Sequence, residues 1–174
     1  MAAERALREK DTLAASCGDY LLMHRSALSE NHIHESLLRI YQKDGQTLSK
    51  TLISLRVGGQ PTHGIKTYSH ESLVFLNSGL LHLFRMTHLS GGETDLGLMI
   101  IQRPRFPSTS VMYGHALTSS VILPGRVMPS PIMMRKIAGN VLDLYRQHCG
   151  AWSLDDPHID DATREFFKTG KQTG

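Results

Sequence analysis

Histidine has the widest chemical range of the side chains in this sequence, because it serves both in acid–base catalysis and as a metal ligand. The chain of 174 residues contains ten histidines. His32 and His34 are followed by Glu35, and the two rings would share one face of a strand but diverge on a helix. A metal site needs further ligands at suitable spacing, and neither His63 nor His70 completes a recognisable motif. We therefore expect no metal site and no cofactor.

A nucleophilic thiol is the other catalytic group that the sequence suggests. His148 and Cys149 are adjacent, and a histidine that bonds a thiol can activate it. Neighbouring residues of a helix point in different directions, so the two side chains would not form that bond in the helix expected here. We expect Cys17 and Cys149 to be free thiols, as is usual in a reducing compartment. The sequence thus predicts a binding or assembly protein and not an enzyme.

Positive charge is concentrated in the middle of the chain. Residues 47–151 contain ten Lys or Arg and four Asp or Glu, so their net charge is 10 − 4 = +6, whereas the whole chain carries +3. A folded basic surface attracts phosphate backbones or acidic lipid headgroups. We expect this surface to consist of Arg56, Lys66, Arg103, Arg105, Phe106, Arg126, Arg135 and Lys136.

The spacing of apolar residues predicts the elements that position these side chains. Residues 51–57 alternate between apolar and polar, which is typical of a half-buried strand. Apolar residues at helical spacing predict two amphipathic helices, over residues 69–86 and 130–150, each with a serine as N-cap. Three short strands are predicted between the helices, over residues 96–102, 110–115 and 118–123. Residues 160–168 are predicted to form a short C-terminal helix.

Two segments are less clear. Residues 31–43 have a helical apolar stripe that stops at Asp44-Gly45, but the same Asp-Gly could turn a β-hairpin, so both structures stay open. Residues 1–28 contain only scattered apolar positions and are expected to form a flexible N-terminal arm that orders against a neighbour. The expected self-association contacts within this arm are Tyr20, Leu21 and Leu22.

The element order predicts one α+β domain over residues 29–174, in which two amphipathic helices cover a small antiparallel β-sheet. No run of about 18 apolar residues is present. The N-terminus alternates charges where a signal peptide would be apolar. We therefore expect a protein that is not secreted and has no transmembrane segment.

The strand over residues 51–57, the Lys66-Thr67-Tyr68-Ser69 start of the first predicted helix, and the Leu98-Met99-Ile100-Ile101 strand together resemble rhabdovirus matrix proteins. The resemblance covers roughly residues 48–148 in element order. It implies a structural protein that self-associates, condenses the viral nucleocapsid and links it to an acidic membrane and the envelope glycoprotein. Such a protein would lie in the virion and the host cytoplasm, peripheral to the membrane. The nearly neutral residues 1–28 would suit a plant-infecting member.

Two other functions fit the sequence less well. An RNA-binding viral accessory protein, such as a silencing suppressor, would place the same basic residues on phosphates. Few aromatic residues lie near Arg103 and Arg105 for base stacking, only Phe106 and Tyr113. A small His-dependent metalloenzyme would need several of the histidines named above to line one pocket.

Overall fold

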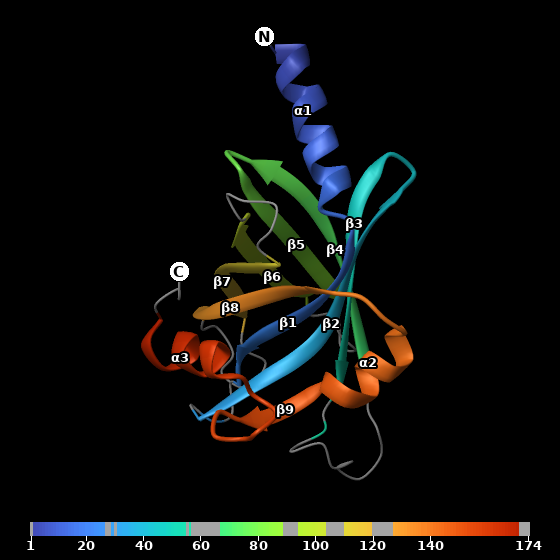
Figure 1. Cartoon of the computed structure of the whole chain (residues 1–174). Helices are drawn as coiled ribbons and strands as arrows, with labels where there is room; N and C mark the ends of the chain where they lie inside the picture. Colours follow the sequence, from blue (N-terminus) through green and yellow to red (C-terminus); the bar gives the residue numbers. More distant parts are fainter. Residues whose placement is uncertain are drawn as a thin grey trace.

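The computed structural model gives the protein three α-helices and nine β-strands within the residues that it describes (Figure 1). These residues are 2–26, 29, 31–54, 56, 67–88, 94–103, 110–119 and 127–170. The helices are α1 (Ala2–Ala15), α2 (Val141–His148) and α3 (Asp161–Thr169). The strands are β1 (Gly18–Arg25), β2 (His32–Lys43), β3 (Gln46–Ser54), β4 (Thr67–Asn77), β5 (Leu80–His88), β6 (Thr94–Gln102), β7 (Val111–Ser119), β8 (Val127–Ile137) and β9 (Gly150–Ser153).

The strands β1 to β8 form a closed antiparallel barrel. Each strand pairs with the next one along the chain, and β1 pairs with β8 as well as with β2. Closure of this kind pairs the backbone groups at both edges of a sheet. The last strand, β9, lies outside the ring and pairs with the start of β2. Within the described ranges, the helices are too short or too polar to cross a lipid bilayer.

The predicted α+β fold, with a small sheet covered by two helices, is wrong. Residues 69–86 form most of β4 and β5, which reverse at Ser78-Gly79, where φ is 53° and 80°. Positive φ at both central residues is typical of a tight hairpin turn. The turn interrupts the alternation of the two strands, so that leucines on either side of it imitate the spacing of a helix. These leucines are Leu73, Leu76, Leu80 and Leu83.

The second predicted helix, over residues 130–150, is also wrong for its first half. Those residues continue β8 as far as Ile137, and helix α2 begins only at Val141, after Asn140 as N-cap. The separate strands predicted over residues 110–115 and 118–123 are one strand, β7, which ends at Ser119. Residues 120–123 lie outside the described ranges. The strand within residues 51–57, the strand over residues 96–102 and the C-terminal helix are confirmed as parts of β3, β6 and α3.

The sequence left open whether Asp44-Gly45 turns a β-hairpin. In the structure it does, and the hairpin consists of β2 and β3. Asp44 and Gly45 have φ of 50° and 78°, which fits a two-residue turn between antiparallel strands. The N-terminal segment also differs from the expected arm, because residues 2–15 form α1 and residues 18–25 form β1 of the barrel. The boundary expected at residue 28 therefore lies between two paired strands, β1 and β2.

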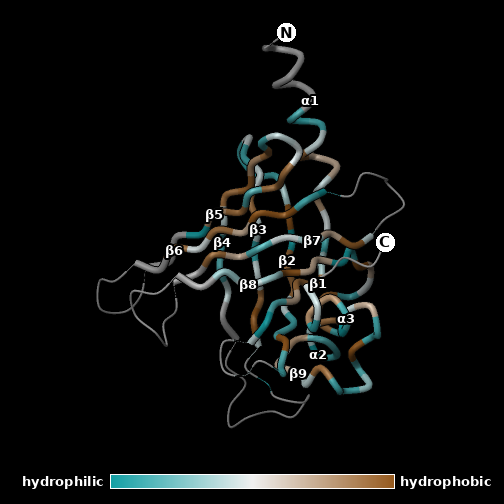
Figure 2. Tube along the Cα trace, turned by 90° about the vertical axis from the view of Figure 1, so that its left-hand side faces the viewer, coloured by the Kyte–Doolittle hydropathy of each residue, from teal (hydrophilic) through white to brown (hydrophobic). Residues whose placement is uncertain are grey.

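Alternation along the strands divides the apolar residues into two cores. Hydrophobic residues recur along the barrel strands in Figure 2. The inward-facing core lines the barrel, and Leu13 of α1 and Cys17 pack against it at one end. The second core lies on the outer face of β1, β2 and β8, under a C-terminal layer made of α2, β9 and α3. Its buried members are Leu21, Met23, Ile33, Leu37, Met133, Cys149, Leu154, Ile159, Phe166 and Phe167.

A substitution at Gly114 tests how closely β6 and β7 approach each other. A Cβ atom at this position would lie 2.1 Å from the carbonyl oxygen of Ile100 and 2.9 Å from the Cα of Ile101. Because both neighbours are backbone atoms, the strands would have to move apart. We predict that Gly114→Ala lowers the free energy of unfolding by about 3 kcal/mol or more, measured by urea denaturation.

The matched control is Gly45→Ala, at a glycine with φ of 78° and no atom within 4 Å of its added Cβ. Its cost is limited to the backbone strain of a left-handed residue, about 1–2 kcal/mol. Equal losses in the two variants would contradict the close approach of β6 and β7.

Candidate functional site

Polar side chains lie inside the barrel, at the end away from α1. His24 of β1 and His34 of β2 are paired in register, and their rings stack with centroids 5.4 Å apart. Arg85 of β5 is close enough to act electrostatically on His24. His24 lies two residues from Leu22 on β1, and His34 lies four residues from Leu38 on β2. Both leucines belong to the inner core. Strand alternation therefore directs the two rings into the barrel.

Three buried serines extend this group. Ser36 is adjacent to the histidines on the inner face of β2, and its Oγ lies 3.3 Å from Nδ1 of His34. Ser49 of β3 pairs in register with Ser72 of β4, and Ser72 pairs with Arg85. We call His24, His34, Ser36, Ser49, Ser72 and Arg85 the interior polar cluster.

Some atoms of the interior polar cluster are buried without a hydrogen bond. Within the described part of the chain, these include Oγ of Ser49 and Oγ of Ser72. Ser49 is 0% exposed and Ser72 is 4% exposed. A buried polar atom without a partner costs about 1–3 kcal/mol, so natural proteins usually supply one. The barrel thus offers hydrogen-bonding capacity that its own described residues do not use.

Burial keeps both histidines neutral near pH 7. It lowers the pKa of His24 below its usual 6.5, and the charge of Arg85 lowers that pKa further, although a hydrogen bond to the Arg25 carbonyl opposes the change. The pKa of His34 falls to about 4, first because of burial and then because of His24. A neutral imidazole has one donor and one acceptor nitrogen. The cluster therefore combines one fixed positive charge with neutral hydrogen-bonding groups.

The sequence makes room for Arg85 inside the barrel. Its register partner on β6 is Gly97. A Cβ atom at Gly97 would lie 3.2 to 3.3 Å from Nε, Cζ and Nη2 of Arg85, which is tighter than normal contact. The guanidinium group thus lies across the position that a larger residue would occupy. An alanine at position 97 would displace the guanidinium group of Arg85.

The predicted basic surface is divided in the structure. Arg56 donates to the carbonyl oxygens of Tyr145 and Arg146 at the end of α2. Arg135 forms an ion pair of 2.7 Å with Asp160, the N-cap of α3. Both arginines therefore hold the C-terminal layer in place and do not present free charge.

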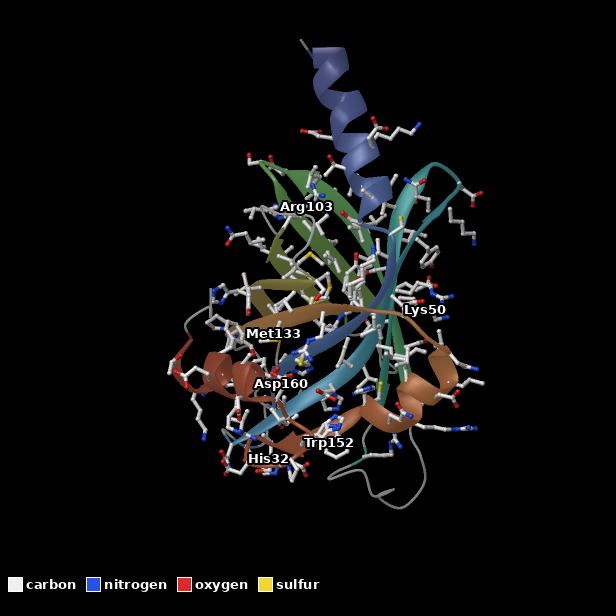
Figure 3. All side chains as sticks on the ribbon, in the orientation of Figure 1. His32, Lys50, Arg103, Met133, Trp152 and Asp160 are labelled. Atoms are coloured by element: carbon white, nitrogen blue, oxygen red, sulfur yellow. The ribbon has the colours of Figure 1, made fainter. Side chains whose placement is uncertain are left out.

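Two of the other predicted basic residues lie near Tyr20. Nζ of Lys136 is 6.0 Å from the centre of the Tyr20 ring, and Arg103 acts electrostatically on the same side chain. Figure 3 shows Arg103 at the α1 end of the barrel. Lys136 shares the inner face of the barrel with its register partner Tyr20, whereas the adjacent Arg135 lies on the outer face, where it pairs with Asp160. Four more predicted residues lie outside the described ranges: Lys66, Arg105, Phe106 and Arg126.

The expected self-association contacts are core residues in this structure. Tyr20 and Leu22 belong to the barrel interior, and Leu21 belongs to the core under the C-terminal layer. Their exposed fractions are only 2%, 4% and 3%. They are therefore not available as a docking surface while β1 stays in the barrel. Binding to the nucleocapsid, to acidic membranes and to further copies of the chain stays a prediction.

A pocket of about 390 Å³ lies on the outside of the barrel, between α2 and the strands β2 and β3. Its apolar lining consists of Leu37, Leu38, Leu52, Ile137, Val141 and Leu144. The Arg39–Asp19 ion pair of 2.6 Å lies at its edge. None of the residues of α2 is fully buried. The pocket therefore reflects loose packing of this helix against the barrel.

The structure rearranges the groups considered for catalysis and metal binding. His34 faces the barrel interior, Nδ1 of His32 lies 2.8 Å from Oγ of Ser29, and His63 is outside the described ranges. Cys17 and Cys149 are free thiols, as expected. Burial raises the pKa of Cys149 to about 12, so its thiol is not a nucleophile at neutral pH.

One group with metal-ligand chemistry was missed from the sequence. Glu35, His148 and His158 have donor atoms within 4.8 Å of one another. More than a hundred residues separate Glu35 from the two histidines, so their spacing carries no local signal. In contrast, a hairpin register for residues 18–40 would have paired His24 with His34.

Comparisons of the chain with protein families, with curated proteins and with solved structures found no match. The resemblance to rhabdovirus matrix proteins depended on a helix that starts after Tyr68, whereas residues 67–77 form strand β4. That element order is thus not found in the described residues, and the matrix role stays a prediction. The function has to be argued from the geometry of the site.

The buried histidines predict how stability depends on pH. Because the pKa of folded His24 is lowered, only the unfolded chain takes up this proton as the pH falls below 6.5. The protein should therefore lose stability as the pH falls from 7.5 to 5. Groups that face His24 are His34 on β2 and Arg85 on β5. His24→Gln, which cannot take up a proton, should lose less stability over this range in urea denaturation.

His115→Gln is the matched control, since His115 is an exposed histidine of β7. It should keep the pH dependence of the wild type. If His24→Gln also kept it, His24 would not be buried in its neutral form.

Proposed function

We propose that the protein binds a small organic anion inside its barrel, with Arg85 as the charge partner of the ligand. The observation that carries the proposal is the interior polar cluster. It combines an arginine, two stacked neutral histidines and buried hydroxyl groups inside a closed barrel. Binding is the function that this arrangement supports best.

The energetic cost of the cluster supports a functional role. Apolar side chains of similar volume would fill the barrel without the cost of buried hydroxyl groups that have no hydrogen bond, such as those of Ser49 and Ser72. Groups with strongly shifted pKa values, such as His34 at about 4, gather at functional sites. Antiparallel barrels of eight strands are wide enough to hold one small ligand. A ligand that bonds to the buried serine hydroxyls would offset their cost.

The chemistry of the cluster indicates the class of ligand. A guanidinium group binds carboxylate, sulfonate or phosphate oxygens with charge-assisted hydrogen bonds. The neutral imidazoles and serine hydroxyls can donate to further oxygens of the same ligand. Met99 and Leu76, which are only partly buried, pack against the inner core and offer apolar contact. An organic acid with a compact apolar body fits these features.

Fluorescence of 1-anilinonaphthalene-8-sulfonate, an aromatic sulfonate, provides a direct test. The wild type should bind this probe, and Arg85→Met should raise the dissociation constant at least about tenfold, because the charge partner is lost. The matched control is Arg146→Met, at an exposed arginine of α2 with 73% side-chain exposure. It should bind like the wild type.

The pocket outside the barrel is the competing site for the same probe. Leu144→Gln changes the lining of that pocket and leaves the barrel interior intact. The proposal predicts that this variant binds the probe like the wild type. Unchanged binding by Arg85→Met, or loss of binding in Leu144→Gln alone, would contradict the proposal. Circular dichroism spectra of all variants establish that each one is folded.

A further inference from the structure

A carboxylate and two imidazoles converge outside the barrel, under the C-terminal layer. Glu35 lies on the outer face of β2, and its side chain is 4% exposed. Its Oε2 is 2.7 Å from Nε2 of His158 and 3.7 Å from Nδ1 of His148. The donor atoms of the three residues all lie within 4.8 Å of one another. Figure 3 shows Trp152, on β9, in the same region.

The spacing of these donor atoms fits one small metal ion. Ligand atoms that bind Zn²⁺ tetrahedrally at about 2.0–2.2 Å lie about 3.4 Å from one another. The two distances from Glu35, 2.7 and 3.7 Å, lie on either side of this value. Two imidazole nitrogens and one carboxylate oxygen form a donor set that binds Zn²⁺ and other divalent first-row metals, with the remaining position left to water.

An unused ring nitrogen supplies independent support. Nδ1 of His148 is buried and makes no hydrogen bond within the described residues. It lies beside the buried Oε2 of Glu35, at a distance that is too long for a hydrogen bond. A metal ion between the two atoms would satisfy both of them. The carboxylate itself is bonded to the ring of His158, whose Nε2 lies 2.7 Å from Oε2.

Neighbouring groups hold the two histidines in position. The indole N–H of Trp152 donates to the carbonyl oxygen of His148 at 2.8 Å. The Trp152 ring stacks on His158 with centroids 4.1 Å apart. The backbone N–H of His158 donates to Oδ1 of Asp156 at 2.9 Å. Such outer contacts orient metal ligands and are a usual part of metal sites.

We propose that Glu35, His148 and His158 bind a divalent transition-metal ion of the zinc class. The three residues come from β2, from the last turn of α2 and from the segment between β9 and α3. A bound ion would therefore fasten the C-terminal layer to the barrel. It would add to the attachment that the outer core and the pairing of β9 with β2 already provide.

Titration calorimetry with zinc chloride tests the proposal on the full chain after removal of metal with a chelator. The wild type should bind one equivalent, and its melting temperature should rise with the zinc concentration, because the ion binds only the folded arrangement. Glu35→Gln and His148→Ala should each weaken binding at least about tenfold. His115→Ala, at an exposed histidine of β7, should bind zinc like the wild type.

The visible absorption of bound Co²⁺ provides a second test, which uses the wild type and so does not depend on the stability of a variant. Co²⁺ bound by the wild type should give the visible bands of a tetrahedral or five-coordinate site, and added Zn²⁺ should remove them. His24→Gln distinguishes this site from the stacked histidines in the barrel and should leave the bands unchanged. Absence of zinc binding by the wild type would overturn the proposal. So would binding that survives both Glu35→Gln and His148→Ala, or that disappears in His24→Gln.

Discussion

The structure depends on the pairing of β1 with both β2 and β8. This strand pairs over eight residues with β2 and over six with β8, and these ladders close the barrel. Its two faces carry different cores, with Leu22 inside the barrel and Met23 under the C-terminal layer. Removal of β1 would therefore expose two unpaired sheet edges and both cores together. A segment of weak apolar pattern thus closes the barrel.

Closure also creates the environments of the two candidate sites. Adjacent residues of β2 point to opposite faces, so His34 reaches the barrel interior while Glu35 reaches the space under the C-terminal layer. Inside the barrel, low polarity keeps the histidines neutral beside Arg85. Outside it, α2 and the segment after β9 bring two histidines to one buried carboxylate. Strand β2 thus supplies His34 to the candidate ligand site and the next residue, Glu35, to the candidate metal site.

Cap and turn residues gave correct local signals in two places, whereas the helical spacing over residues 69–86 was misleading. Asp160 caps α3 by accepting a hydrogen bond from the Thr163 amide, and Asp44-Gly45 makes the tight turn that the sequence allowed. Long-range pairing left no such signal, because β1 meets β8 more than a hundred residues later. Charge counts showed an excess of basic residues but not that Arg56 and Arg135 bond within the molecule. The candidate sites were missed for a similar reason, since each combines residues that are far apart in the sequence, such as His24 with Arg85 and Glu35 with His148.

Hydrogen exchange of the β1 amides tests the closed barrel most directly. If β1 is a central strand, the amides of residues 19–24 should exchange as slowly as those of β2 and β8, only when the whole domain unfolds. Nuclear magnetic resonance of the protein in deuterated water resolves these amides one by one. If they exchanged at the rate of an unstructured peptide while β3 to β6 stayed protected, β1 would be an arm. The barrel would then be open, and both candidate sites would lose their basis.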